Sequence, residues 1–176
     1  MSKEDAGGPL DEATIREFLA SDYPRLVAGV ALVTGNRAAA EDAVQEALAR
    51  AWERSERGER IDSLPAWVTR VAMNLSRSRF RRMRAEARAR ERIAAAVRPA
   101  ADVAVGVDVR RALAGLPRRQ RETTVLRYYL GMDVAEIAAT LGVAEGTVKV
   151  SLHRARRALA EGLGERELEE ANDRGD

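Results

Sequence analysis

The sequence predicts an all-α protein built from two small helical domains that a flexible linker joins. Apolar residues recur at i, i+3, i+4 and i+7 along most of the chain, and no stretch shows a convincing strand alternation. Gly, Pro and Asn separate these helical patterns. The segment PAADVAVG, residues 99–106, has small side chains and no apolar stripe, so it is predicted to divide the two domains.

The first half begins with two predicted helices. Residues 1–10 are polar and Gly-rich and are expected to be frayed. Helical spacing then runs from Ile15 to Val33, and Pro24 is expected to kink or restart this helix. Gly35-Asn36 supplies a stop followed by an N-cap. A second helix is therefore predicted over about Arg37 to Glu56.

A third helix is predicted after the polar loop at residues 57–63, because Pro65 suits a first helical turn. Its inner stripe is Val68, Val71, Ala72, Leu75 and Phe80. The second domain is predicted to begin near Val107, and Pro117 and Gly131 bound a helix within it. Residues from Gly164 onward are expected to form a loose, charged tail.

The strongest motif lies at residues 132–159. Asp133 to Leu141 has the apolar stripe of a short helix, and Gly142 follows where a residue must accept positive φ. A further helix begins near Glu145 and buries Val148, Leu152, Ala155 and Leu159. Two short helices joined by a tight, Gly-containing turn form a helix-turn-helix, whose second helix lies in the DNA major groove.

The face of that second helix opposite its buried stripe is basic. At about 100° per residue, this face carries Gly146, Val150, His153, Arg154 and Arg157, with Lys149 at its flank. Long cationic side chains reach phosphates and donate to guanine N7 and O6. On this stretch alone, an ordinary helical hairpin with a solvated basic face stays open.

Two further polar faces lie in the first domain. The second helix places Asp42, Gln45, Glu46, Ala49 and Glu53 on one side. Catalysis is not expected there, because no nucleophile, metal ligand or phosphate-binding loop is near. Two interpretations stay open: a solvated acidic face and a docking surface for a basic partner. The third helix aligns Trp67, Arg70, Asn74, Arg77 and Arg81, a set that suits stacking on unpaired bases and holding phosphates. Periodicity equally allows a core Trp67 with solvated arginines.

Composition narrows the chemistry. With no Cys and only one His, the chain offers no disulfide, thiol nucleophile, Cys-based zinc site or His cluster. We therefore expect no metal, no cofactor and no enzyme activity. No run is long or apolar enough to span a bilayer and no signal peptide is present, so a cytoplasmic protein without membrane insertion is expected.

With both halves laid out, the chain resembles extracytoplasmic function (ECF) sigma factors of the sigma-70 family from about Glu17 to Leu163. The first domain has YPRLVAGVALVTGNRAAAEDAVQEALARAW and PAWVTRVAMNLSRSRFRR; the second has LPRRQRETTVLRYYLGMDVAEIAATLGVAEGTVKVSLHRARRAL. The resemblance implies region 2 over residues 1–95, a linker over 96–106 and region 4 over 107–176. It also implies a factor that binds core RNA polymerase and directs promoter-specific initiation of transcription.

The resemblance further assigns roles to the three faces. Asp42, Gln45 and Glu46 would dock on the polymerase β′ clamp helices, and the second domain would meet the β flap. Residues 57–63 and the face from Trp67 to Arg81 would bind the −10 element as it opens. The basic face from Lys149 to Arg157 would read the −35 element of promoter DNA. An anti-sigma factor is an implied partner.

One departure from the family pattern concerns the recognition helix. Val150 and Ser151 stand where the family usually has Ser and Arg. Val150 cannot donate to a phosphate but can contact a thymine methyl, and whether position 151 faces a phosphate or the core stays open. Two other functions also stay open: a helix-turn-helix regulator independent of polymerase, and a sigma-like decoy that sequesters an anti-sigma factor.

Overall fold

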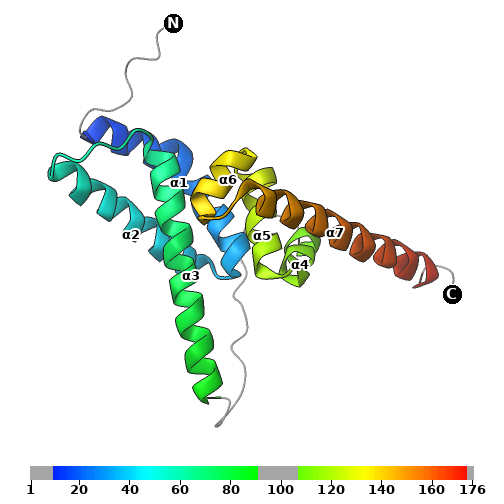
Figure 1. The fold of residues 1–176 in the computed structure, drawn as a ribbon. Helices are drawn as coiled ribbons and strands as arrows, with labels where there is room; N and C mark the ends of the chain where they lie inside the picture. Colours follow the sequence, from blue (N-terminus) through cyan, green and yellow to red (C-terminus); the bar gives the residue numbers. More distant parts are fainter. Residues whose placement is uncertain (1–9, 91–106, 174–176) are drawn as a thin grey trace, which may run out of the picture. The chain divides into compact units, whose positions relative to one another are not determined.

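The computed structural model describes residues 10–90 and 107–173 (Figure 1). All regular secondary structure in these two ranges is helical, which confirms the predicted fold class. The chain divides into two compact units, Met1–Val103 and Ala104–Asp176. Residues 1–9 and the predicted linker at 96–106 lie outside the described residues.

The first unit begins with α1, Glu12–Thr34. The Asp11 side chain caps it by accepting a hydrogen bond from the Thr14 amide at 2.8 Å, and Gly35 ends it at φ 72°. The predicted restart at Pro24 is wrong, because α1 runs through this residue as one helix. Proline removes a single amide donor, and buried residues on both sides of Pro24 hold the flanking turns against the core.

Helix α2, Arg37–Glu56, has the predicted bounds and is capped by Asn36. It packs against both α1 and α3, and five of its inward residues are fully buried: Ala40, Ala43, Val44, Ala47 and Ala51. Four of these five are alanines, which let neighbouring helix axes approach closely. This helix therefore packs closely against both of its neighbours.

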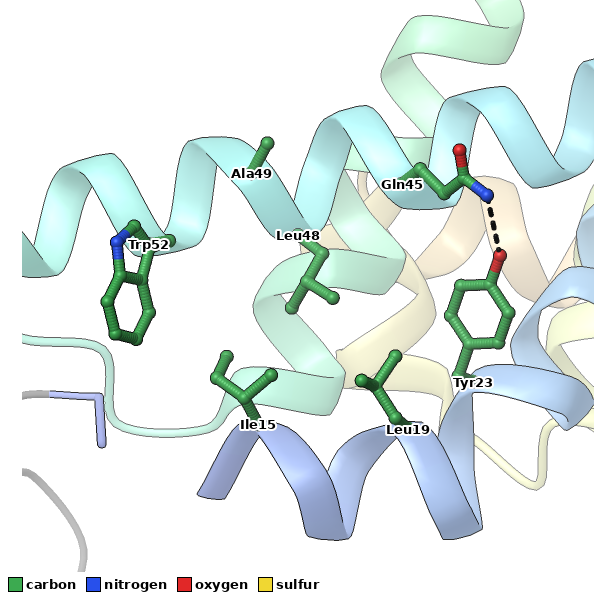
Figure 2. A pocket seen from close by; sticks show the side chains of 7 residues that line it. All are labelled: Ile15, Leu19, Tyr23, Gln45, Leu48, Ala49 and Trp52. Carbon is green, nitrogen blue, oxygen red and sulfur yellow. Dashed lines mark hydrogen bonds between the residues drawn. The ribbon is translucent and has the colours of Figure 1, made fainter. Parts of the chain in front are cut away.

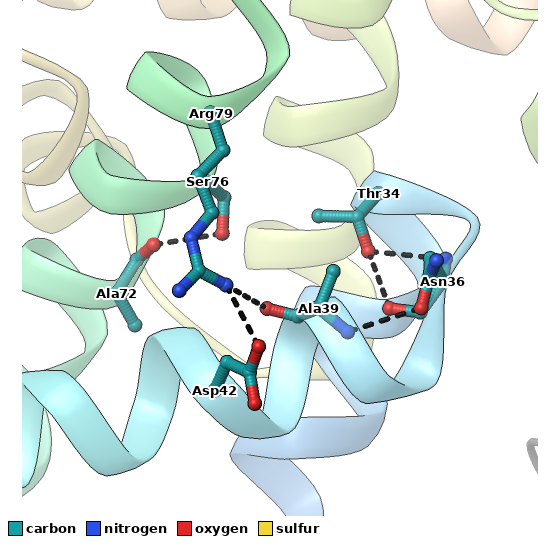
Figure 3. Close-up of polar contacts among 7 residues, drawn as sticks. All are labelled: Thr34, Asn36, Ala39, Asp42, Ala72, Ser76 and Arg79. Atoms are coloured by element: carbon teal, nitrogen blue, oxygen red, sulfur yellow. Dashed lines mark hydrogen bonds and ion pairs between the residues drawn. The ribbon is translucent and has the colours of Figure 1, made fainter. Parts of the chain in front are cut away.

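Helix α3, Leu64–Arg90, follows the predicted loop. Val68 and Ala72 are buried as expected, and Val71 and Leu75 are half-buried. Met73 is also buried, although it lies outside the predicted stripe. The buried Ser76 hydroxyl donates to the Ala72 carbonyl at 2.8 Å, which satisfies it within the helix (Figure 3).

The second unit contains α4, Val107–Gly115, and α5, Arg118–Thr124. The helix predicted from Pro117 to Leu130 is not regular, because α5 passes into a π-helical segment, Val125–Tyr129. There the Leu130 amide donates to the Val125 carbonyl at 3.0 Å. Five consecutive residues, Glu122 to Leu126, are buried, so this stretch is enclosed and its periodicity could not reveal the wider turn.

A charged cluster on α5 ties this unit together. Glu122 is 2% exposed, and its Oε1 lies 2.9 Å from Arg118 Nε while its Oε2 lies 3.6 Å from Arg119 Nη1. Arg121 donates to the carbonyls of Ala114 and Leu116, at 2.7 and 3.2 Å, beside the end of α4. Burial, together with the charge of Arg118, lowers the pKa of Arg121, and the Glu122 carboxylate opposes this shift.

The predicted helix-turn-helix is formed by α6, Val134–Leu141, and α7, Glu145–Asp173. Asp133 and Glu136 make a reciprocal capping box at the start of α6, and Gly142 ends it at φ 63°. Helix α7 continues across Gly164, so the predicted loose tail is wrong up to Asp173. The stretch ERELEEA consists of good helix formers, which offset the roughly 1 kcal/mol that one glycine costs.

Candidate nucleic-acid interface

The core of the second unit sets the orientation of α7. Val148, Leu152 and Ala155 are 0, 7 and 1% exposed on a helix that packs against α5 and α6. The side chains predicted to face DNA are all exposed: Lys149, Val150, His153, Arg154 and Arg157. The recognition helix thus presents a basic face outward while three of the four predicted inward residues are buried. The fourth, Leu159, is only half-buried.

Two of these cations have exposed acidic partners on the same helix. Lys149 Nζ lies 4.0 Å from Glu145 Oε2, and Arg157 Nη2 lies 3.4 Å from Glu161 Oε1. Such surface pairs are worth about 0–1 kcal/mol. Both cations can therefore exchange a carboxylate for a phosphate at little cost.

The two residues of α7 that depart from the family pattern, Val150 and Ser151, lie on opposite sides of the helix. Ser151 is 8% exposed, so position 151 faces the core and not a phosphate. Val150 is 50% exposed on the predicted DNA side. The Arg-to-Ser departure from the family pattern therefore falls on the packed side of the helix.

The predicted −10 face of α3 is partly enclosed. Arg70, Asn74 and Arg81 are exposed, whereas Trp67 and Arg77 are half-buried. Trp67 is thus neither a fully buried core residue nor a fully exposed one. The Phe80 side chain, predicted to be inward, lies outside those that the structure describes.

The loop before α3 is held by its own charges and one apolar anchor. Glu59 contacts Arg54 at 2.7 Å and Arg57 at 3.5 Å. Ile61 is 7% exposed, and Gly58 adopts φ 78°. The ion pairs therefore tie the loop to the end of α2.

The acidic face of α2 is exposed, but each predicted docking residue already has a partner within the unit. Arg79 of α3 donates to Asp42 Oδ2 at 3.2 Å and to the Ala39 carbonyl at 3.5 Å (Figure 3). Gln45 donates to the Tyr23 hydroxyl at 3.3 Å, and Glu46 pairs with Arg50 at 2.8 Å. Arg79 was not predicted, because it stands 37 residues from Asp42 and no local spacing connects them.

An apolar groove of about 510 Å³ borders this acidic face (Figure 2). It is lined by Ile15, Leu19 and Tyr23 of α1 and by Gln45, Leu48, Ala49 and Trp52 of α2. Leu19 and Trp52 are 44 and 40% exposed. Gln45 and Ala49 belong to both surfaces, so the groove and the acidic face are continuous.

None of the helices in the described ranges is long and apolar enough to cross a membrane. Family comparisons match residues 19–86 to Sigma-70 region 2 and residues 107–159 to Sigma-70, region 4. The chain is 35% identical to the ECF RNA polymerase sigma factor SigL of Mycobacterium tuberculosis, over 88% of this chain and 92% of the relative. It is 34% identical to the ECF RNA polymerase sigma factor SigF of Caulobacter vibrioides, over 86% of each.

Solved structures agree with these sequence matches. The sigma factor RpoE from Bartonella quintana, in complex with the anti-sigma factor NepR, has a TM-score of 0.71 and 29% identity, over 88% of this chain and 98% of that one. CnrH, in complex with the cytosolic domain of CnrY, has a TM-score of 0.61 and 26% identity, over 88% and 90%. With both regions matched, the chain belongs to the ECF sigma factors of the sigma-70 family, non-enzymatic proteins that direct transcription initiation by RNA polymerase.

Proposed function

We propose that the three exposed faces divide the work of promoter recognition. The basic face of α7 reads the −35 element through Lys149, Val150, His153, Arg154 and Arg157. The observation that carries this assignment is the orientation of α7, whose apolar stripe is buried while every one of these side chains is exposed. Cations then position the helix on phosphates, and the groove-facing side chains contact base edges.

The −10 element is held by the first unit in this proposal. Arg70, Arg77 and Arg81 contact the backbone, and Asn74 offers donors and an acceptor to an unpaired base. The half-buried Trp67 stacks on an unpaired base. Unstacking a base costs a few kcal/mol, which aromatic stacking of about 1–3 kcal/mol per base and phosphate contacts offset.

Docking on core polymerase uses the acidic face of α2. Asp42, Gln45 and Glu46 meet the β′ clamp helices, and the adjoining groove accepts an apolar side chain beside Trp52. The present partners of these residues are exposed ion pairs and one hydrogen bond, so polymerase can replace them at small cost. The second unit meets the β flap, which fixes its distance from the first.

The protein also has an anti-sigma partner in this proposal. The support is RpoE from Bartonella quintana, a similar chain over 88% of this one, whose structure contains the anti-sigma factor NepR. The exposed groove with Leu19 and Trp52 supplies an apolar surface. Such a partner, by covering polymerase-docking residues, would keep the factor inactive in the cytoplasm until a signal releases it.

The test begins with run-off transcription from a fragmented genomic library, using purified core polymerase with and without the protein. New start sites that share spaced −35 and −10 sequences define the promoter. Glu46→Lys should then abolish core binding. Glu41→Lys is the matched control, because it lies on the same helix and has the same type of exposed i,i+4 pair with arginine.

A second pair of variants separates DNA reading from docking. Arg154→Ala should keep core binding but weaken initiation at promoters that depend on the −35 element. Arg111→Ala removes an exposed cation of the same unit that lies on α4, away from the proposed face, and should have a smaller effect. Core binding by Glu46→Lys at the wild-type level, or equal effects of the two arginine variants, would contradict these assignments.

A further inference from the structure

The exposed face of α7 is not uniformly basic. Val150 is 50% exposed, and Gly146 and Thr147, one turn earlier, are exposed as well. Residues three and four positions apart are neighbours on a helix surface, so these three form one uncharged patch. A Cβ at Gly146 would have nothing within 4 Å, which leaves this end of the patch open to close approach.

Cations border the patch but do not cover it. Lys149, His153 and Arg154 are all exposed around Val150. The buried neighbours Ser151 and Leu152 prevent the helix from turning to hide Val150 without exposing core surface. An apolar side chain is therefore held in the middle of a surface whose other long side chains suit phosphates and purine edges.

The chemistry of the DNA groove identifies what such a side chain can recognise. The thymine C5-methyl is the apolar group that a base pair offers in the major groove, and apolar protein groups contact it. Contact would remove the two methyl surfaces from water, which is favourable in proportion to the area covered. A hydroxyl or charged group in the place of Val150 would gain nothing from that methyl.

We infer that Val150 is a specificity-determining residue of the −35 contact and selects thymine at one or two base pairs through the C5-methyl. Gly146 permits the approach, and the surrounding cations hold the backbone. This inference rests on the proposed function of α7. Covering one methyl group is worth about four-fold in affinity.

Deoxyuridine tests this directly, because it differs from thymidine only in lacking that methyl. Holoenzyme made from core polymerase and the full chain is offered promoter DNA from the run-off experiment. Each −35 thymine, on either strand, is replaced by deoxyuridine in turn, and promoter affinity is measured by competition. Wild-type holoenzyme should lose about four-fold in promoter affinity at one or two positions. Val150→Ala, whose single methyl reaches less far, should lose less affinity at those positions.

Val109→Ala is the matched control, because Val109 is 53% exposed on α4 of the same unit. It should keep the wild-type sensitivity to deoxyuridine. The inference would be overturned if wild-type affinity did not change with deoxyuridine at any −35 position, or if Val150→Ala lost as much affinity as the wild type. In either case, initiation that still depends on the −35 element would leave the proposed function standing. Initiation that ignores every −35 substitution would overturn both.

Discussion

Glu122 offers the sharpest test of the packing in the second unit. Its side chain is 3% exposed, and two guanidinium groups hold its oxygens from one side of α5. Glu122→Gln preserves the volume but removes the charge and replaces one acceptor with an amide donor. That donor then faces the donors of an arginine, so the variant loses attraction and gains an unfavourable contact.

The magnitude follows from how exposed the partners are. Removing one member of a fully buried ion pair costs about 3–5 kcal/mol. Here the side chains of Arg118 and Arg119 are 26 and 42% exposed, so water solvates part of the charge left behind. We therefore expect a loss of about 2 kcal/mol in the unfolding free energy of this unit, or a fall of about 10 °C in its Tm.

The positions of the tryptophans make the measurement specific. The chain has two, Trp52 and Trp67, and both lie in the first unit. Tryptophan fluorescence therefore follows the first unit, whereas far-UV circular dichroism follows the helices of both. In urea or heat, Glu122→Gln should shift the dichroism transition and leave the fluorescence transition unchanged.

Glu145→Gln is the matched control, because it removes an exposed carboxylate from the same unit instead of a buried one. Glu145 is 55% exposed and lies 4.0 Å from Lys149, so its removal should cost less than about 1 kcal/mol. If the dichroism transition of Glu122→Gln had the same midpoint as that of Glu145→Gln, the buried ion pair would not stabilise this unit. An equal shift in fluorescence would show that the effect is not local.

Three further predictions concern the turns and the core. Gly142→Ala should destabilise the second unit by about 1–2 kcal/mol because φ is 63° there, whereas Gly146→Ala, helical and unobstructed, should be neutral or stabilising by dichroism. Met73→Ala should cost the first unit about 2–5 kcal/mol by fluorescence, since its side chain is 1% exposed. The hydrogen bond from the Thr14 amide lowers the pKa of the Asp11 carboxyl in the folded state. The ionised cap therefore stabilises the folded protein above the unfolded-state pKa of Asp11, and this contribution is lost as the pH falls through the folded-state pKa. Asp11→Ala should thus lower the Tm at neutral pH but not in strong acid.

Local sequence was sufficient for the parts of the fold that depend on neighbouring residues. Asn36 and Gly142 marked helix ends because capping and positive φ are properties of single positions. The buried and exposed sides of α7 followed from helical period alone, which is why the proposed DNA-reading side chains are exposed as a set. The family was likewise recognisable from sequence, because regions 2 and 4 are each continuous stretches of the chain.

Sequence failed where the outcome depends on enclosure. Pro24 signalled a break, yet packing on either side keeps α1 continuous. Residues Glu122 to Leu126 are all buried although the first three are polar, so the pattern of polar and apolar residues did not report burial here, and the π-helical turn went unseen. Gly164 is a separate case with a local reason: it suggested a helix end, but the helix formers that follow it keep α7 continuous.

By itself, then, the sequence determined most of the helices, the caps at Asn36 and Gly142, the recognition helix and the acidic and basic faces, because each arises from residues within a few turns of one another. Only the tertiary structure decided that Arg79 forms an ion pair with Asp42, that α1 and α2 line a groove at Trp52, and that Ser151 is buried while Val150 is exposed. These features require contacts between helices, and the distance between two helices is set by every side chain packed between them.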